Sequence, residues 1–144
     1  MHHSAVVNGH DRAAVDGILS RWSMGAVRSP MEDYERCLAC LKRDPMRTGA
    51  NATYFLFIQN ALATSPDPAV RWRAMCLAED VLSRSRVADF GILMNLARCA
   101  IQDEYAWVFI AFERILGRFP EQFRHPDVVR EIKRMVHTHR QVVA

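Results

Sequence analysis

Apolar residues recur at helical spacing along most of this chain, and turn-forming residues interrupt the pattern at intervals. The pattern predicts seven helices, and no alternating stretch typical of a strand competes with them. The expected helices span residues 11–22, 30 to the Asp44–Pro45 pair, 51–64, 68–84, 87–101, 104–119 and 126 onwards.

Two of the helix starts have clear capping signals. Ser29 and Glu32 form a capping-box pattern, with Pro30 at the first helical position. Asp67 can accept hydrogen bonds from first-turn amides, and the proline that follows it lacks only an N–H that would be unpaired anyway. We expect Asp103 to cap the sixth helix in the same way, whereas Asn51 is expected to cap the third.

The length of 144 residues suits one domain with its own core, and half of the residues are hydrophobic. We expect a single all-α domain over residues 11–144. Residues 1–10 show no periodicity, and we expect them to form a flexible N-terminal arm. The third helix is apolar almost all round, which predicts a central position in the fold.

A short segment of the fourth helix joins a helix start, an apolar stripe and an arginine. The segment contains Asp67, Val70, Arg71, Ala74 and Leu77. With these residues the chain resembles the second helix of HEAT repeats, and it resembles that family loosely over residues 51–140. The resemblance implies an array of antiparallel helical hairpins, in which Arg71 bonds an acidic or carbonyl group of a neighbouring repeat.

A second sign of repetition is the similarity of Glu79–Arg84 to Glu113–Arg118. The offset between Glu79 and Glu113 fits a unit of two helices. A generic bundle of helical hairpins is the alternative architecture.

The HEAT family consists mainly of scaffolds that bind proteins, with a minority that bind nucleic acid. The surplus apolar surface of the sixth helix, which includes Trp107, Ile110 and Ala111, must be covered by neighbouring helices or by a partner. We therefore expect a non-catalytic protein-interaction or adaptor module, with a homodimer as one form of it. The expected contact residues are Trp72, Arg73, Trp107 and Arg114.

The distribution of charge along the chain makes nucleic acid the alternative partner. The net charge is only +3, but the segment Arg114–Arg140 contains seven basic and three acidic residues, a local excess of +4. Tryptophans can stack on bases while arginines contact phosphates. A basic surface that includes Trp72 and Trp107 would suit such a role.

Residues capable of chemistry form no recognisable catalytic or metal-binding pattern. Cys37 and Cys40 have the spacing of zinc and redox sites, but they fall inside a predicted helix without a second pair. His137 and His139 are two residues apart, which points them in different directions on a helix. No signal selects a general acid or base among the candidate carboxylates, which are Glu79, Asp80, Asp103, Glu104 and Glu113. The sequence favours a protein that is not an enzyme, and it predicts no metal and no cofactor.

The longest apolar run, Tyr54–Ile58, is far too short to cross a bilayer, and no secretory signal is recognisable. The four cysteines all lie in predicted helices among apolar neighbours, which is typical of free thiols. We expect a cytoplasmic protein without a membrane contact.

Overall fold

The computed structural model describes residues 2–24, 27–43, 50–84, 90–118 and 126–143. These residues form seven helices and no strand, so the described part of the protein is all-α. The helices are α1 (His2–Met24), α2 (Pro30–Arg43), α3 (Ala50–Thr64), α4 (Pro68–Arg84), α5 (Phe90–Gln102), α6 (Ala106–Arg118) and α7 (Pro126–Val143).

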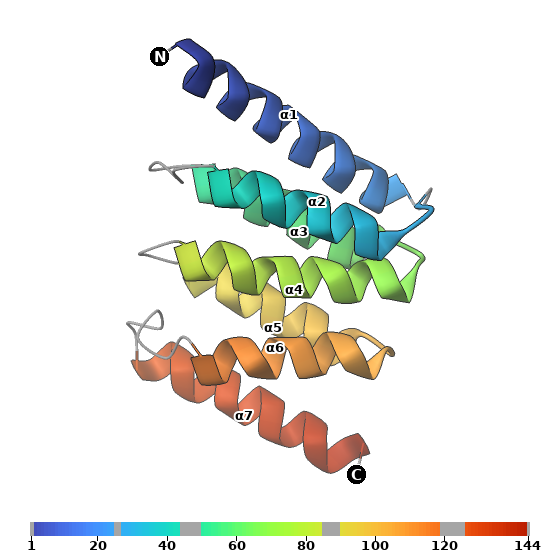
Figure 1. The fold of residues 1–144 in the computed structure, drawn as a ribbon. Coiled ribbons are helices and arrows are strands. Elements are labelled where there is room, and N and C mark those ends of the chain that lie inside the picture. The colour runs from blue at the N-terminus through green and yellow to red at the C-terminus, as the bar shows by residue number, and fades with distance from the viewer. Residues whose placement is uncertain (1, 25–26, 44–49, 85–89, 119–125, 144) are drawn as a thin grey trace.

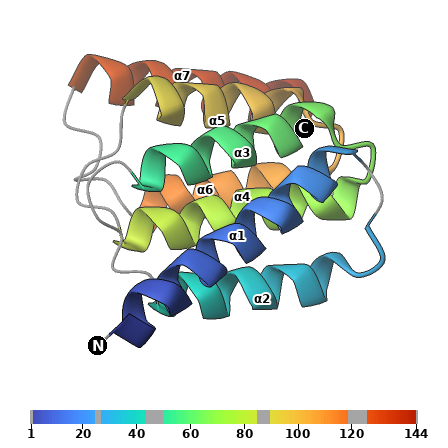
Figure 2. The ribbon, with the colours of Figure 1, turned by 90° about the horizontal axis from the view of Figure 1, so that it is seen from above.

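The helices form two layers (Figures 1 and 2). In the layer nearest the viewer of Figure 1, which we call the front layer, α4 lies between α2 and α6 and contacts both. The back layer consists of α1, α3, α5 and α7, each in contact with the next. Each front helix also contacts the back helix that precedes it in the chain. The three front helices run in the same direction, so their first turns lie along one edge of the layer.

The core lies between the two layers. In α4, Val70, Ala74 and Leu77 are fully buried, because spacings of three and four residues place them on one side of the helix. Phe55 of α3 is also buried, but Leu56 beside it is 68% exposed. The helix that was expected to be apolar all round is therefore buried on one side only.

The three front helices begin at a constant interval. Their first residues are Pro30, Pro68 and Ala106, and the step from Pro30 to Pro68 equals the step from Pro68 to Ala106. We call this step the front-helix interval. The offset from Glu79 to Glu113 that was expected from the sequence is shorter, so it is not the spacing of the helices. The similarity between α4 and α6 on which it rested is out of structural register.

Hydrogen bonds in the turns before α4 and α6 show the same interval. The amides of Ser65 and Asp103 each donate to the carbonyl oxygen four residues earlier, at 2.9 and 3.1 Å. Their side-chain oxygens each accept from the amide two residues later, at 3.4 and 2.9 Å. Asp103 is thus the structural equivalent of Ser65, whereas Asp67 corresponds to Tyr105. The two turns share these hydrogen bonds although their sequences differ.

Capping explains where several helices begin. The hydroxyl oxygen of Ser29 accepts from the amide of Glu32 at 3.2 Å, and Asp67 Oδ1 accepts from the amide of Ala69 at 2.9 Å. α6 begins at Ala106, two residues after the expected start, because Asp103 bonds the amide of Tyr105 in the turn before the helix.

Two other helix starts also differ from the expectation. α1 begins at His2 instead of at residue 11, since no proline interrupts the helix before that point, and it includes most of the segment expected to be a flexible arm over residues 1–10. α3 begins at Ala50, so Asn51 lies inside the helix and is not its cap.

Arg71 of α4 ties two turns together. Its Nε and Nη2 donate to the carboxylate of Asp103 at 2.8 and 3.3 Å, and its Nη1 donates to the carbonyl oxygen of Ser65 at 2.8 Å. The side chains of Arg71 and Asp103 are only 19% and 5% exposed. Bidentate, charge-assisted bonds in such a setting are much stronger than surface ion pairs. The network therefore fixes the turn between α5 and α6 against the start of α4.

Replacing Arg71 by alanine should lower the free energy of unfolding by about 3 kcal/mol, because the carboxylate of Asp103 would stay buried without its cation. Urea unfolding followed by circular dichroism measures the loss. Arg98→Ala on the exposed side of α5 is the matched control and should cost less than about 0.5 kcal/mol. A loss below about 1 kcal/mol for Arg71→Ala would show that other contacts hold the turns.

Candidate protein-binding surface

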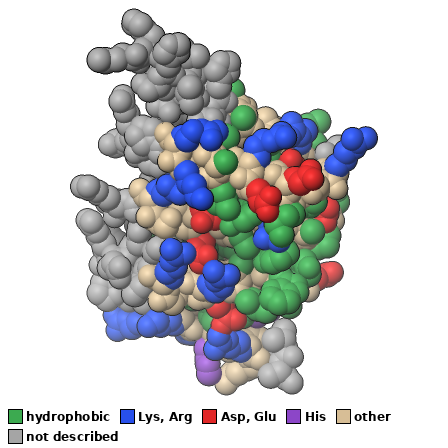
Figure 3. Space-filling view, viewed as in Figure 1, with side chains coloured by type: hydrophobic (Ala, Val, Ile, Leu, Met, Phe, Trp, Pro, Cys, Tyr) green, Lys and Arg blue, Asp and Glu red, His purple; other side chains and the backbone are tan. Residues whose placement is uncertain are grey.

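The outer face of the front layer carries large apolar side chains at repeated positions. The front-helix interval makes Met31, Ala69 and Trp107 equivalent, and it makes Tyr34, Trp72 and Ile110 equivalent. The two positions are three residues apart, so on each helix they share a face. We call Met31, Tyr34, Trp72, Trp107 and Ile110 the apolar stripe. In Figure 3, hydrophobic side chains gather on the surface of the front layer, over the N-terminal halves of α4 and α6.

The apolar stripe is partly open to solvent. Met31 is 48% exposed, Trp107 51% and Ile110 41%, whereas Tyr34 and Trp72 are half-buried. Met31 and Tyr34 therefore lie outside the fully buried side of α2. That side is formed by Cys37, Cys40 and Leu41, because this helix lies at the end of the layer with only one front neighbour.

Aromatic contacts join the front helices within the stripe. The rings of Trp72 and Trp107 bridge α4 and α6, with centroids 5.9 Å apart and planes tilted by 42°. The guanidinium carbon of Arg73 lies 3.9 Å from the ring centre of Trp72 and 5.2 Å from that of Tyr34 on α2. Cation–π contacts of this kind hold the guanidinium group between two rings.

Tyr34 makes a second contact between α2 and α4. Its hydroxyl donates to Asp80 Oδ2 on α4 at 2.6 Å. Burial raises the pKa of Tyr34 well above its ordinary value, and the bond to the Asp80 carboxylate adds to the effect. The phenol therefore stays protonated and keeps donating to Asp80 at neutral pH.

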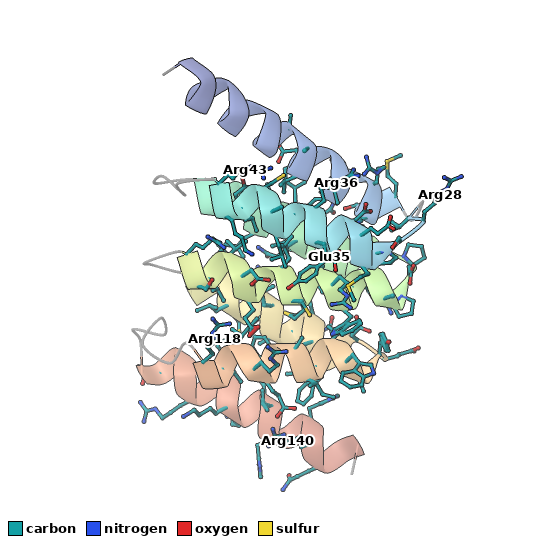
Figure 4. The ribbon with its side chains drawn as sticks, in the orientation of Figure 1. Arg28, Glu35, Arg36, Arg43, Arg118 and Arg140 are labelled. Atoms are coloured by element: carbon teal, nitrogen blue, oxygen red, sulfur yellow. The ribbon has the colours of Figure 1, made fainter. Side chains whose placement is uncertain are left out.

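Glu79 anchors the arginines of α6. It is 8% exposed, and its Oε1 lies 3.3 Å from Arg114 Nη2 and 3.8 Å from Arg118 Nη1. Its Oε2 is buried without a hydrogen-bond partner among the described residues. Figure 4 shows Arg118 at the C-terminal end of α6. One buried carboxylate thus pairs with two arginines. The sequence carried no signal for this arrangement and indicated Glu79 only as one of five candidate acids.

The four residues expected to form the contact surface all lie on α4 and α6. The structure brings Trp72 into contact with both Arg73 and Trp107, and it places Arg114 farther along α6 against Glu79. Sequence reasoning missed Tyr34, whose equivalence with Trp72 depends on the front-helix interval. That interval is visible in the chain only as two Xaa-Pro helix starts, at Pro30 and Pro68.

Several of the residues with possible catalytic chemistry make structural contacts. Among the described residues no cluster of three or more metal-binding side chains occurs. His139 packs against Phe109 with ring centroids 4.6 Å apart, while His137 is exposed. A hollow of about 400 Å³ includes Asp103, but that carboxylate is already engaged by Arg71. No described helix is both long and apolar enough to cross a membrane.

Burial raises the pKa values of Cys37, Cys76 and Cys99, so these thiols are poorly ionised at neutral pH. Burial raises the pKa of Cys37 to about 12, with the neighbouring Cys40 adding to the shift, and burial raises the pKa of Cys76 to about 11. Cys37 and Cys40 both lie in the buried face of α2. These are properties of packed thiols and differ from those of a redox pair, whose attacking thiol has a lowered pKa.

Comparison with known proteins identifies no relative: no protein-family model matches this chain, and neither a curated protein nor a solved structure does.

The raised thiol pKa values predict slow alkylation. At pH 8 only about one Cys76 thiol in a thousand should be ionised, and fewer at Cys37, so these two thiols of the native protein should react with iodoacetamide far more slowly than a free cysteine. Mass spectrometry of time points, with urea-unfolded protein as the control, measures the rates. Modification of Cys37 in the folded protein at the rate of the unfolded chain would contradict the burial of this thiol.

Proposed function

We propose that this chain is a HEAT-like helical-repeat module that binds another protein through the apolar stripe and has no catalytic activity. The observation that carries the proposal is the exposure of Trp107 and Ile110 beside Trp72 on adjacent helices. Clustered large apolar side chains at a surface lose their contact with water only when another molecule covers them. Tryptophan, tyrosine and arginine are also the residues that contribute most to binding at protein interfaces.

The HEAT-like part of the proposal is supported by the arrangement of the helices. The front helices start at a constant interval, each one pairs with a back helix, and the layers extend by stacking of neighbours. Arg71 contacts both an acidic group and a carbonyl oxygen in the adjoining turns. Repeat arrays of this kind present a broad outer surface formed by equivalent positions on parallel helices, which suits the binding of a macromolecule.

The pairing of the basic residues favours protein over nucleic acid. Of the seven basic residues between Arg114 and Arg140, five lie against carboxylates. Arg114 and Arg118 share Glu79, while Arg140 pairs with Glu113 across α6 and α7 (Figure 4). Arginines that are neutralised within the protein have less charge to offer to phosphates, and affinity for nucleic acid depends mainly on such contacts.

Replacing Trp107 by alanine should weaken binding of the partner by roughly 30-fold while leaving the fold intact, because a half-exposed tryptophan contributes more to an interface than to the core. The partner is first isolated from the native host on the immobilised chain and then purified. Isothermal titration calorimetry compares its affinity for the wild-type protein and for the Trp107→Ala variant.

Leu56→Ala is the matched control, because Leu56 is a large exposed apolar residue on the back layer. Its affinity should stay within twofold of wild type. Equal affinities for wild type and Trp107→Ala would disprove binding through the stripe. Recovery of nucleic acid that is released by salt would instead identify the other class of partner.

A further inference from the structure

The apolar stripe has a regular spacing that restricts what can lie along it. Parallel helices that pack side by side are separated by about 8–10 Å. Equivalent positions on α2, α4 and α6, such as Tyr34, Trp72 and Ile110, therefore recur at about this distance across the front layer. A ligand that contacts all three helices must present its apolar groups at the same spacing.

An α-helix comes closer to this spacing than an extended strand does. Residues seven apart on a helix lie on the same side and are about 10.5 Å apart along its axis. Same-face residues of a strand are separated by about 6.8 Å or twice that value, which is out of step with the front helices. The spacing of the stripe thus selects a helix that crosses the front layer.

The charged groups beside the apolar stripe indicate which charge the edge of that helix should carry. Over α4 and α6, three guanidinium groups, those of Arg73, Arg114 and Arg118, are accompanied by the carboxylates of Glu79 and Asp80. Glu79 is held by the two arginines of α6, and Asp80 accepts the hydroxyl of Tyr34. Arg73 has aromatic contacts but no ion pair with a described residue.

We infer that the apolar stripe binds an amphipathic helix of a partner protein, with apolar residues repeated every seven positions and carboxylates on the edge that faces Arg73. The inference rests on the proposed function and specifies its partner. A carboxylate on the ligand would accept hydrogen bonds from the guanidinium group of Arg73. Because two aromatic rings already hold this group in place, its side chain would lose little conformational freedom on binding. At the equivalent of Arg73, α2 has Glu35 (Figure 4) and α6 has Ala111, so the acidic edge of the ligand lies over α4.

A second copy of this chain fits the same surface less well. A two-fold pairing through the stripe would bring its central helix, α4, against α4 of the other copy. If the two-fold axis passed beside Trp72, Arg73 would lie near the Arg73 of the second copy, and two like charges would lose solvent together. A helix with an acidic edge avoids this cost.

The test uses a display library of stabilised helical peptides about 18 residues long, which is enough to cross three helices. Peptides are selected on the wild-type protein and depleted on the Trp107→Ala variant. We expect the retained sequences to combine apolar residues seven apart with Asp or Glu on one edge. Replacing those acids by Lys should abolish binding.

Point variants measured by fluorescence anisotropy with the best peptide sharpen the test. Arg73→Gln should weaken binding by about tenfold. Arg98→Gln is the matched control, since Arg98 is an exposed arginine of the back layer, and it should bind within twofold of wild type. Circular dichroism confirms that each variant is folded.

The other outcomes separate the inference from the proposed function. Peptides that need Trp107 but are basic or non-helical would overturn the acidic helix and leave the interaction surface in place. A wild-type dimer in light scattering that Trp107→Ala converts to a monomer would make a second copy the occupant and overturn the inference. If no peptide depends on Trp107 and the purified host partner binds Trp107→Ala normally, both proposals fail.

Discussion

The guanidinium group of Arg71 connects the turn before α4 with the turn before α6. It bonds the carbonyl oxygen before α4 and the carboxylate before α6, so two successive turns are held at a set distance. Because the front helices start directly after these turns, their first turns come into line along one edge of the layer. Trp72 and Trp107 lie close to those starts and can meet only if the alignment holds. The geometry of the outer surface thus depends on a contact made beneath it.

The same position on each front helix reaches a neighbouring element, although the chemistry changes. Arg71 is equivalent to Asp33, which accepts from the indole N–H of Trp22 at 3.1 Å, and to Phe109, which packs on His139. A hydrogen bond, an ion pair and a ring contact therefore occupy one structural position. The three front helices have so little sequence in common that only their geometry relates them, which explains why local similarity suggested a shorter spacing than the one at which these helices begin.

How much of this could be predicted from the sequence depends on how local each signal is. Helix number and the start of α4 follow from apolar periodicity and from the Asp67–Pro68 cap, both of which act within one or two turns. The contact between Trp72 and Trp107 could not be predicted in this way. It depends on how α4 and α6 are aligned, and these two helices are separated in the chain by α5. The sequence offered Glu79 only as one of five candidate acids for a similar reason: its ion pairs with Arg114 and Arg118 join α4 to α6, and a pattern within α4 cannot reveal them.

The constant interval between front helices has a consequence for how such a chain can change length. Inserting or removing a segment of that length, from a given point in one turn to the same point in the next, would keep every turn and every helix boundary in register. Insertions of any other size would rotate or displace the helices that follow. Duplication within the gene would therefore enlarge the array by one pair of helices at a time, and each step would widen the outer surface by about the separation of two packed helices.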